Sequence, residues 1–280
     1  MRNDVADTMV RLLRHARYEV LPTARIVDQV TEAVPTDVQI TVTASAAKGL
    51  AQTLDTAETL SRAGYDVVPH LAARLIHNPT ELGEIVDRLT GLGVHAVFVP
   101  GGDAEAVGEF PDALAVLESL TEMGRPFDHV GIAGYPESHP TIHDDVTIQS
   151  MWDKRLHATH VVSNLTFDPA IIKRWLHRMR QRGVTMPLLL GMPGPVDRAK
   201  LLSMATKIGV GESTKFLVKQ KGVMARLAAP GGFTGERFLA KCAPALGEPG
   251  ARVDGLHVYT FNQVAETEAW RQRLLATIKH

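Results

Sequence analysis

Short apolar runs alternate with longer stretches of helical periodicity along the whole chain. The runs are apolar on both faces, as expected of strands that are buried on both sides of a parallel sheet. We expect strands at Arg17–Leu21, Val38–Thr43, Asp66–Leu71, Ala96–Pro100, His129–Gly134, His160–Leu165, Pro187–Gly191 and Gly255–Thr260.

The stretches between these runs predict helices. In Thr80–Gly91, leucine, isoleucine and valine recur at intervals of three and four residues, which is typical of an amphipathic helix. Asn78 and Asp168 each stand before an early proline and have the side chains that cap helix starts. The same spacing predicts helices over Pro169–Arg182, Asp197–Ile208 and Asn262–Ile278, and a leading helix within residues 1–15.

Strands that are each followed by a helix favour a (βα)8 barrel, which typically takes about 250 residues. The chain has 280 residues, with no linker and no internal repeat, so we predict one domain over residues 1–280. It would carry an extra N-terminal helix. Residues 209–250 form an enlarged segment before the last strand, with helical pieces at Thr214–Leu227 and Gly235–Ala243.

Composition excludes several classes of protein. Lys plus Arg is 30 and Asp plus Glu is 31, so the basic surface of a nucleic-acid binder is missing. A single cysteine, Cys242, excludes a disulfide framework. The apolar runs are shorter than the roughly 20 residues that cross a bilayer, and the charged first residues do not resemble a signal peptide. We therefore expect a cytoplasmic enzyme without a membrane partner.

Polar residues at the ends of the predicted strands are the candidates for function, since barrel enzymes build their sites there. They are Glu19, Thr43, His70, Asp103, Tyr135, Glu137, His139 and Asn164. Glu19 stands in an apolar run, where burial of a lone carboxylate is costly and raises its pKa. One explanation is an ion pair with an arginine or lysine of a neighbouring strand. His139, His143 and Asp144 match no metal-site spacing, so we expect no metal.

The strand ends, taken in order over residues 17–275, resemble the methylenetetrahydrofolate reductase family. The most specific block is Ala133–Pro140, which is similar to that family's A-x-Y-P-E-x-H-P. The other matching segments are Tyr18–Pro22 (E-F-F-P-P), Pro69–Leu71 (P-H-L), Gly101–Asp103 (R-G-D), Asn164–Asp168 (T-Q-F-x-F-D) and Val258–Asn262 (F-Y-T-x-N).

The resemblance implies reduction of 5,10-methylenetetrahydrofolate to 5-methyltetrahydrofolate. NADH or NADPH would reduce bound FAD and leave before the folate binds to the same flavin face. The resemblance implies that Glu19 is the general acid that protonates the folate N10 nitrogen. Asp103 would tune the flavin and stabilise the cationic intermediate, and Asn164 replaces a glutamine that binds the pterin. The family's bacterial members are often oligomeric, so a homo-oligomer is expected.

The residues that the resemblance assigns to FAD are Thr43, His70, Gly102, Asp103, Tyr135 and His139, with Lys154 at the pyrophosphate and Asp145 at a ribose. Plainer interpretations remain open, among them a backbone-bonded core histidine at His70 and a surface lysine at Lys154. Gly101 replaces the family's arginine, and the A-G-A that usually follows the lysine is not kept. These departures keep open direct hydride transfer from NADH without a flavin. A third hypothesis is a folate- or flavin-binding barrel without turnover.

Overall fold

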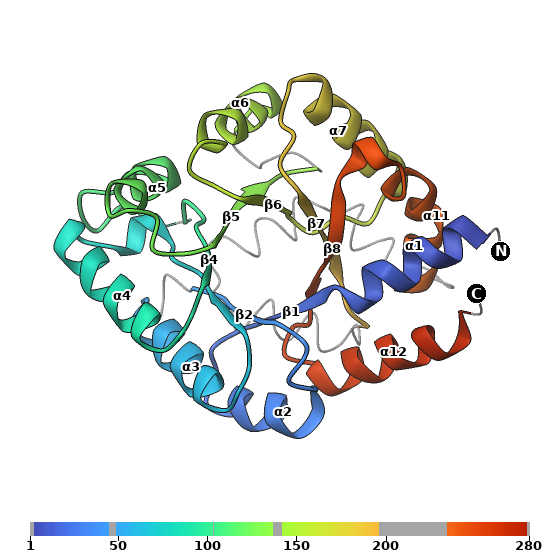
Figure 1. Ribbon diagram of the computed structural model, residues 1–280, viewed down its shortest axis with the longest axis horizontal. Helices are drawn as coiled ribbons and strands as arrows, with labels where there is room; N and C mark the ends of the chain where they lie inside the picture. The colour runs from blue at the N-terminus through green and yellow to red at the C-terminus, as the bar shows by residue number, and fades with distance from the viewer. Residues whose placement is uncertain (1–2, 45–48, 103, 137–141, 196–233, 279–280) are drawn as a thin grey trace.

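The computed structural model describes residues 3–44, 49–102, 104–136, 142–195 and 234–278 (Figure 1). Eight parallel strands form one sheet in the order β3-β2-β1-β8-β7-β6-β5-β4. An isolated parallel bridge between His70 and Phe98 joins β3 to β4 and closes the sheet. The predicted (βα)8 barrel is therefore confirmed. The strands are β1 (Ala16–Val20), β2 (Ile40–Val42), β3 (Val67–Pro69), β4 (Ala96–Phe98), β5 (His129–Gly134), β6 (His160–Ser163), β7 (Leu188–Pro193) and β8 (Val253–Tyr259).

Helices surround the strands, and the extra N-terminal helix α1 packs beside α11 and α12 (Figure 1). The described α-helices are α1 (Asn3–Arg14), α2 (Ile26–Ala33), α3 (Ala51–Arg62), α4 (Pro79–Gly91), α5 (Ala113–Glu122), α6 (Asp144–Lys154), α7 (Pro169–Gln181), α11 (Gly235–Leu246) and α12 (Val264–Thr277). Short 3-10 turns occupy Ala73–Leu75 and Pro249–Ala251. The side chains of Asn78 and Asp168 accept hydrogen bonds from Glu81 N and Ala170 N, as predicted for helix caps.

Four of the predicted strands are longer than the observed β2, β3, β4 and β6, and the difference is largest at β2 and β3. The apolar runs extend from Val38 to Thr43 and from Asp66 to Leu71, but β2 and β3 have three residues each. Val38 and Leu71 lie outside the hydrogen-bonded strands but are buried. The apolar pattern therefore extends further along the chain than the strand pairing does. The predicted helices Asp197–Ile208 and Thr214–Leu227 lie outside the described residues. Of the predicted enlarged segment, α11 and the 3-10 turn after it are described.

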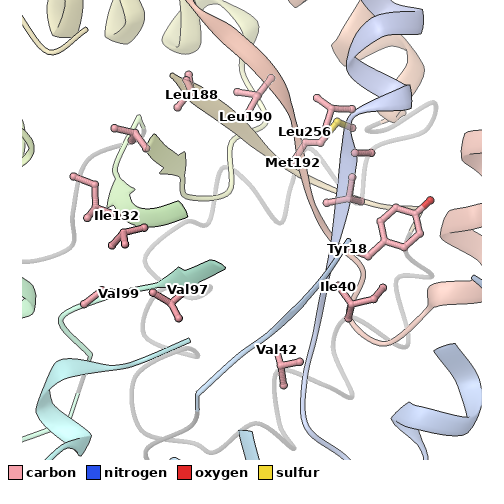
Figure 2. Close-up of a cluster of buried hydrophobic side chains, with 14 of the residues drawn as sticks. Tyr18, Ile40, Val42, Val97, Val99, Ile132, Leu188, Leu190, Met192 and Leu256 are labelled. Carbon is pink, nitrogen blue, oxygen red and sulfur yellow. The ribbon is translucent and has the colours of Figure 1, made fainter. Parts of the chain in front are cut away.

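Alternate residues of each strand face opposite sides of the barrel wall. The outward-facing ones pack under the helices in the main core (Figure 2), which includes Tyr18, Ile40, Val42, Val97, Val99, Ile132, Leu188, Leu190, Met192 and Leu256. A small apolar cluster of Val68, Ala96, Phe98 and Val162 lies apart from that core, at alternate strand positions that face the barrel interior. Four inward-facing side chains of β1 and β8 are polar, whereas barrel interiors are usually filled by valine, isoleucine and leucine. They are Arg17, Glu19, His257 and Tyr259.

Two side chains that follow β8, Asn262 and Thr260, connect its end to the end of β1. Phe261 and Asn262 both have left-handed backbone (φ 51 and φ 60), a conformation that asparagine tolerates better than most residues. The Asn262 amide then bonds both backbone groups of Leu21, accepting from N at 2.8 Å and donating to O at 3.0 Å. Thr260 Oγ1 donates to Glu19 O at 2.6 Å. These bonds fix the end of β1, where Glu19 lies.

Candidate active site

Glu19 lies on the inward face of β1, and its side chain is 16% exposed. Its Oε2 lies 2.9 Å from His257 Nε2 on β8 and 3.8 Å from His70 Nε2 at the end of β3. Among the described residues, its ion-pair contacts are with these two histidines and not with an arginine or lysine of a neighbouring strand. The simple ion pair considered from the sequence is therefore not what the structure contains.

A second polar layer lies two residues earlier along β1. Arg17 is 3% exposed, and its Nε donates to His257 Nδ1 at 2.9 Å. Its Nη1 lies 3.4 Å from His160 Nε2 on β6. The third nitrogen, Nη2, is buried without a hydrogen-bond partner in the described part of the chain. A hydrogen-bonded chain thus runs from Glu19 through His257 and Arg17 to His160, across the barrel interior.

Burial sets the charge state of this cluster. It raises the pKa of Glu19 to about 6, against the attraction of His70 and Arg17 for the carboxylate. It lowers the pKa of His70 and of His160 to about 3, and that of His257 well below its ordinary value. Near neutral pH the three rings are therefore uncharged. The cluster then holds one permanent cation, Arg17, and one acid that titrates close to the physiological range.

The raised pKa of Glu19 predicts a pH-dependent cost in stability. A carboxyl that binds its proton more tightly in the folded state stabilises the fold at low pH and loses that stabilisation as pH rises from about 4.5 to about 6. We expect Glu19→Gln to raise the free energy of unfolding by about 2 kcal/mol at pH 7, because a shift of one pKa unit corresponds to about 1.4 kcal/mol. Below pH 4.5 the two proteins should be equally stable, since both side chains are then neutral.

Urea unfolding of both proteins at a series of pH values measures this difference. The glutamine oxygen still accepts from His257, so the variant keeps the hydrogen bond and removes the charge. A difference that does not change with pH would show that burial does not raise the pKa of Glu19.

Two tyrosines lie near this cluster. Tyr259, on the inward face of β8, stacks edge-on against His257 with ring centroids 4.8 Å apart, and its hydroxyl donates to Ser163 O at 3.3 Å. Burial raises its pKa well above the ordinary value, and the charges of Glu19 and Tyr135 add to this effect. Tyr135 follows β5 and is half-buried. Of the two, only Tyr135 was assigned a role from the sequence.

Thr43 and His70 directly follow β2 and β3, and each holds a buried polar atom without a partner in the described residues. These atoms are Thr43 Oγ1 and His70 Nε2. The His70 ring packs on Phe98, with ring centroids 4.6 Å apart. Buried polar atoms are nearly always hydrogen-bonded, so such a pair at the strand ends fits a bound polar molecule.

The loop after β4 is held by Arg74. Its backbone N donates to Gly101 O at 3.1 Å, and its Nε donates to Pro111 O at 2.8 Å. Gly102 has φ +90, and a Cβ there would contact the Cβ atoms of Ala72 and Arg74 at 3.6 Å. The loop thus presents backbone at the position where the related family has an arginine. Asp103, Glu137 and His139 lie outside the described residues.

Asn164 and Lys154 are both engaged within the protein. Asn164 follows β6; its N donates to Gly134 O at 2.7 Å, and its Oδ1 accepts from Leu165 N at 2.7 Å. Lys154 is the last residue of α6, and its ammonium donates to Ser150 Oγ at 2.6 Å on the same helix. Burial lowers the pKa of Lys154. Asp145 pairs with Arg182 at 2.5 Å on the surface.

Four residues of the cluster have no role predicted from the sequence: Arg17, His160, His257 and Tyr259. A signal for three of them exists, because polar residues two apart in an apolar strand share one face. Arg17 with Glu19, and His257 with Tyr259, follow that pattern on two strands that the barrel makes neighbours. His160 begins its strand and gives no such signal.

Within the described ranges, no three His, Cys, Asp or Glu side chains gather closely enough to hold a metal ion. In the same ranges, no helix combines the length and the apolar character that crossing a membrane requires.

Comparison with known proteins identifies the family. Residues 21–274 match the family described as methylenetetrahydrofolate reductase. An uncharacterized protein from Clostridium thermocellum, which binds two copies of 5-methyl-5,6,7,8-tetrahydrofolic acid, has a similar structure, with a TM-score of 0.63 and 10% identity over 92% of this chain and 95% of that one.

Two further similarities are remote. A 2,3-dimethylmalate lyase has a TM-score of 0.46 and 13% identity over 85% of this chain and 94% of its own. A dihydropteroate synthase from Thermus thermophilus has a TM-score of 0.46 and 14% identity over 95% of this chain and 94% of its own. The match to the family begins directly after β1 and extends over β2 to β8. The chain therefore belongs to the methylenetetrahydrofolate reductase family.

Proposed function

We propose that this protein reduces 5,10-methylenetetrahydrofolate to 5-methyltetrahydrofolate, with Glu19 as the general acid. The observation that carries the proposal is a buried carboxyl at a strand end with its pKa raised to about 6. A general acid works best when its pKa lies near the operating pH. Family membership supplies the substrate class, and the structural neighbour that binds a methyltetrahydrofolate supports it.

Glu19 acts on the leaving nitrogen of the folate. It gives its proton to N10 as the bond between N10 and the bridging carbon breaks, which leaves a C=N cation at N5. Addition of a hydride to that carbon then forms the methyl group. His257 Nε2, at 2.9 Å, stabilises the carboxylate that remains on Glu19. Asp103 would supply a fixed negative charge beside the cation, and Asn164 would bond the pterin.

FAD fits the polar groups at the strand ends. Thr43 and His70 offer the buried atoms without partners in the described residues, Gly102 lies in the loop after β4, and Tyr135 directly follows β5. His139 and Lys154 complete the proposed set, with the ammonium of Lys154 released from Ser150 to reach a phosphate. When bound, FAD would take a hydride from NADH or NADPH and pass it to the folate.

Absorption spectroscopy and a turnover assay test this function together. We expect the purified protein to have the visible absorption of an oxidised flavin, to be bleached by NADH or NADPH, and to recover on addition of methylenetetrahydrofolate. A colourless protein that oxidises NADH only with the folate present would refute FAD and retain the reductase activity. Tight folate binding without any turnover would refute the reductase and leave a binding barrel.

A further inference from the structure

Arg17 restricts where His257 can carry its proton. A guanidinium has only N–H donors and stays charged, so it never accepts a hydrogen bond. Burial lowers the pKa of Arg17 only to about 10, which leaves it cationic at neutral pH. Because Arg17 Nε lies 2.9 Å from His257 Nδ1, Nδ1 must be the acceptor. The ring proton of His257 is then on Nε2, from which it donates to Glu19 Oε2 at 2.9 Å.

The same guanidinium imposes the opposite arrangement on His160. Arg17 Nη1 lies 3.4 Å from His160 Nε2, which makes Nε2 the acceptor and leaves the proton on Nδ1. His160 Nδ1 lies 3.0 Å from Thr159 Oγ1. That hydroxyl can accept this bond, since its own proton goes to Val130 O at 3.2 Å and it also accepts from Val130 N at 2.9 Å. Donors and acceptors therefore match along the whole chain of bonds.

We propose that Arg17 is a positioning residue that holds His257 and His160 in opposite neutral tautomers and thereby keeps the acidic proton of the site on Glu19. A second proton on His257 would have to sit on Nδ1, against the guanidinium. Glu19 and His257 therefore cannot become a carboxylate–imidazolium pair. Since Oε2 accepts from His257, the acidic proton is left to Oε1. The catalytic meaning of this arrangement rests on the proposed function, but the tautomers themselves do not.

The other ionisable groups around the pair do not change this assignment. His70 faces Glu19 from the end of β3, and burial keeps its pKa near 3. Tyr259 faces His257 from β8 and stays protonated. Asp66 acts on Arg17 from a distance and favours its charged form. Burial is the larger cause of the lowered pKa of His257, and Arg17 adds to it while its hydrogen bond fixes the tautomer.

NMR of protein labelled with 15N-histidine tests the proposal on the wild type. We expect His257 to be protonated on Nε2 and His160 on Nδ1, with neither ring titrating between about pH 5 and about pH 8, where an unconstrained histidine does. His257→Gln and His160→Gln assign the signals. A His257 ring protonated on Nδ1, or one that titrates in this range, would overturn the proposal.

Two substitutions of Arg17 separate positioning from simple filling of space. Lysine is also donor-only, so in Arg17→Lys we expect His257 to remain neutral across this range. Glutamine can both donate and accept, so in Arg17→Gln we expect His257 to populate both neutral tautomers and kcat to fall by about tenfold, whereas Arg17→Lys should keep the proton on Nε2. Identical behaviour of the two variants contradicts the proposal. If neither Arg17 variant folds, the NMR spectrum of the wild type still tests the tautomers. Absence of folate turnover in the wild type would refute the proposed function and leave the tautomer proposal standing.

Discussion

Glu19→Gln is expected to lower the rate of methylenetetrahydrofolate reduction by about 10²- to 10⁴-fold, the usual contribution of a positioned general acid. The glutamine side chain has nearly the same shape and still accepts the bond from His257 Nε2. It has no proton to give to the leaving nitrogen, so opening of the folate ring is the step that slows. Single-turnover measurement of folate reduction, with the nicotinamide step followed separately, reports the loss on that step alone.

Two comparisons make this result specific. Oxidation of NADH or NADPH with a quinone acceptor should keep its wild-type rate in Glu19→Gln, because that reaction needs no acid for the folate. Glu32→Gln, a change of the same kind on the exposed face of α2, should leave both reactions unchanged. A Glu19→Gln protein that reduces the folate at half the wild-type rate or better would refute Glu19 as the acid.

Glu268→Ala is expected to destabilise the fold by about 3–5 kcal/mol, the cost of leaving one partner of a buried ion pair without the other. Glu268 and Arg271 on α12 are 6% and 5% exposed and form two bonds of 2.9 Å. Tyr18, which points out of the barrel from β1, donates to Glu268 Oε2 at 2.6 Å. Burial alone would raise the pKa of Glu268, but the bonds from Arg271, Tyr18 and Gln272 more than offset it and lower the pKa.

Urea unfolding measures this loss of stability, provided that the slope of the unfolding free energy against urea concentration is the same as in the wild type. Removing both charges in Glu268→Met with Arg271→Met should restore part of the stability, since well-packed apolar residues can replace a buried ion pair at little cost. The rest stays lost because the buried Tyr18 hydroxyl no longer has an acceptor. Arg62→Ala removes a pair of the same type whose arginine is 70% exposed, and should cost less than about 1 kcal/mol. A loss of that small size for Glu268→Ala would show that the α12 pair is not needed to hold Tyr18 and β1.

Arg17 and Glu268 stabilise opposite faces of β1. The Glu268 pair holds the outward face of β1 through Tyr18, and Arg17 orders the inward histidines next to Glu19. Asn262, which follows β8, hydrogen-bonds the residue after β1 and so holds the end of that strand. The asparagine of the Y-T-x-N segment therefore has a structural role. Its amide bonds the backbone N and O of Leu21, which lies just beyond the end of β1.

Much of the fold could be predicted from the amino-acid sequence, because local patterns encode it. Apolar runs of strand length, separated by periodic helical stretches, are sufficient to indicate parallel strands and crossover helices. His129–Gly134 was predicted with the bounds that β5 has, and the caps at Asn78 and Asp168 lie where their side chains indicated. Strand ends were less accurate at β2 and β3, since burial continues where the hydrogen-bonded ladder stops.

For the candidate site, the sequence identified Glu19, and the tertiary structure supplied its surroundings. A carboxylate in an apolar strand is unusual enough to be noticed without a structure. His257 lies 238 residues away in the chain, and only closure of the barrel brings it to 2.9 Å from that carboxylate. Hydrogen-bond partners, tautomers and pKa values depend on distances between strands, whereas helices and strands depend on residues close in sequence. Local patterns along the chain are thus enough to indicate the barrel and a candidate acid at Glu19, whereas the contacts that bring Arg17 and the neutral histidines together around it exist only in the folded chain.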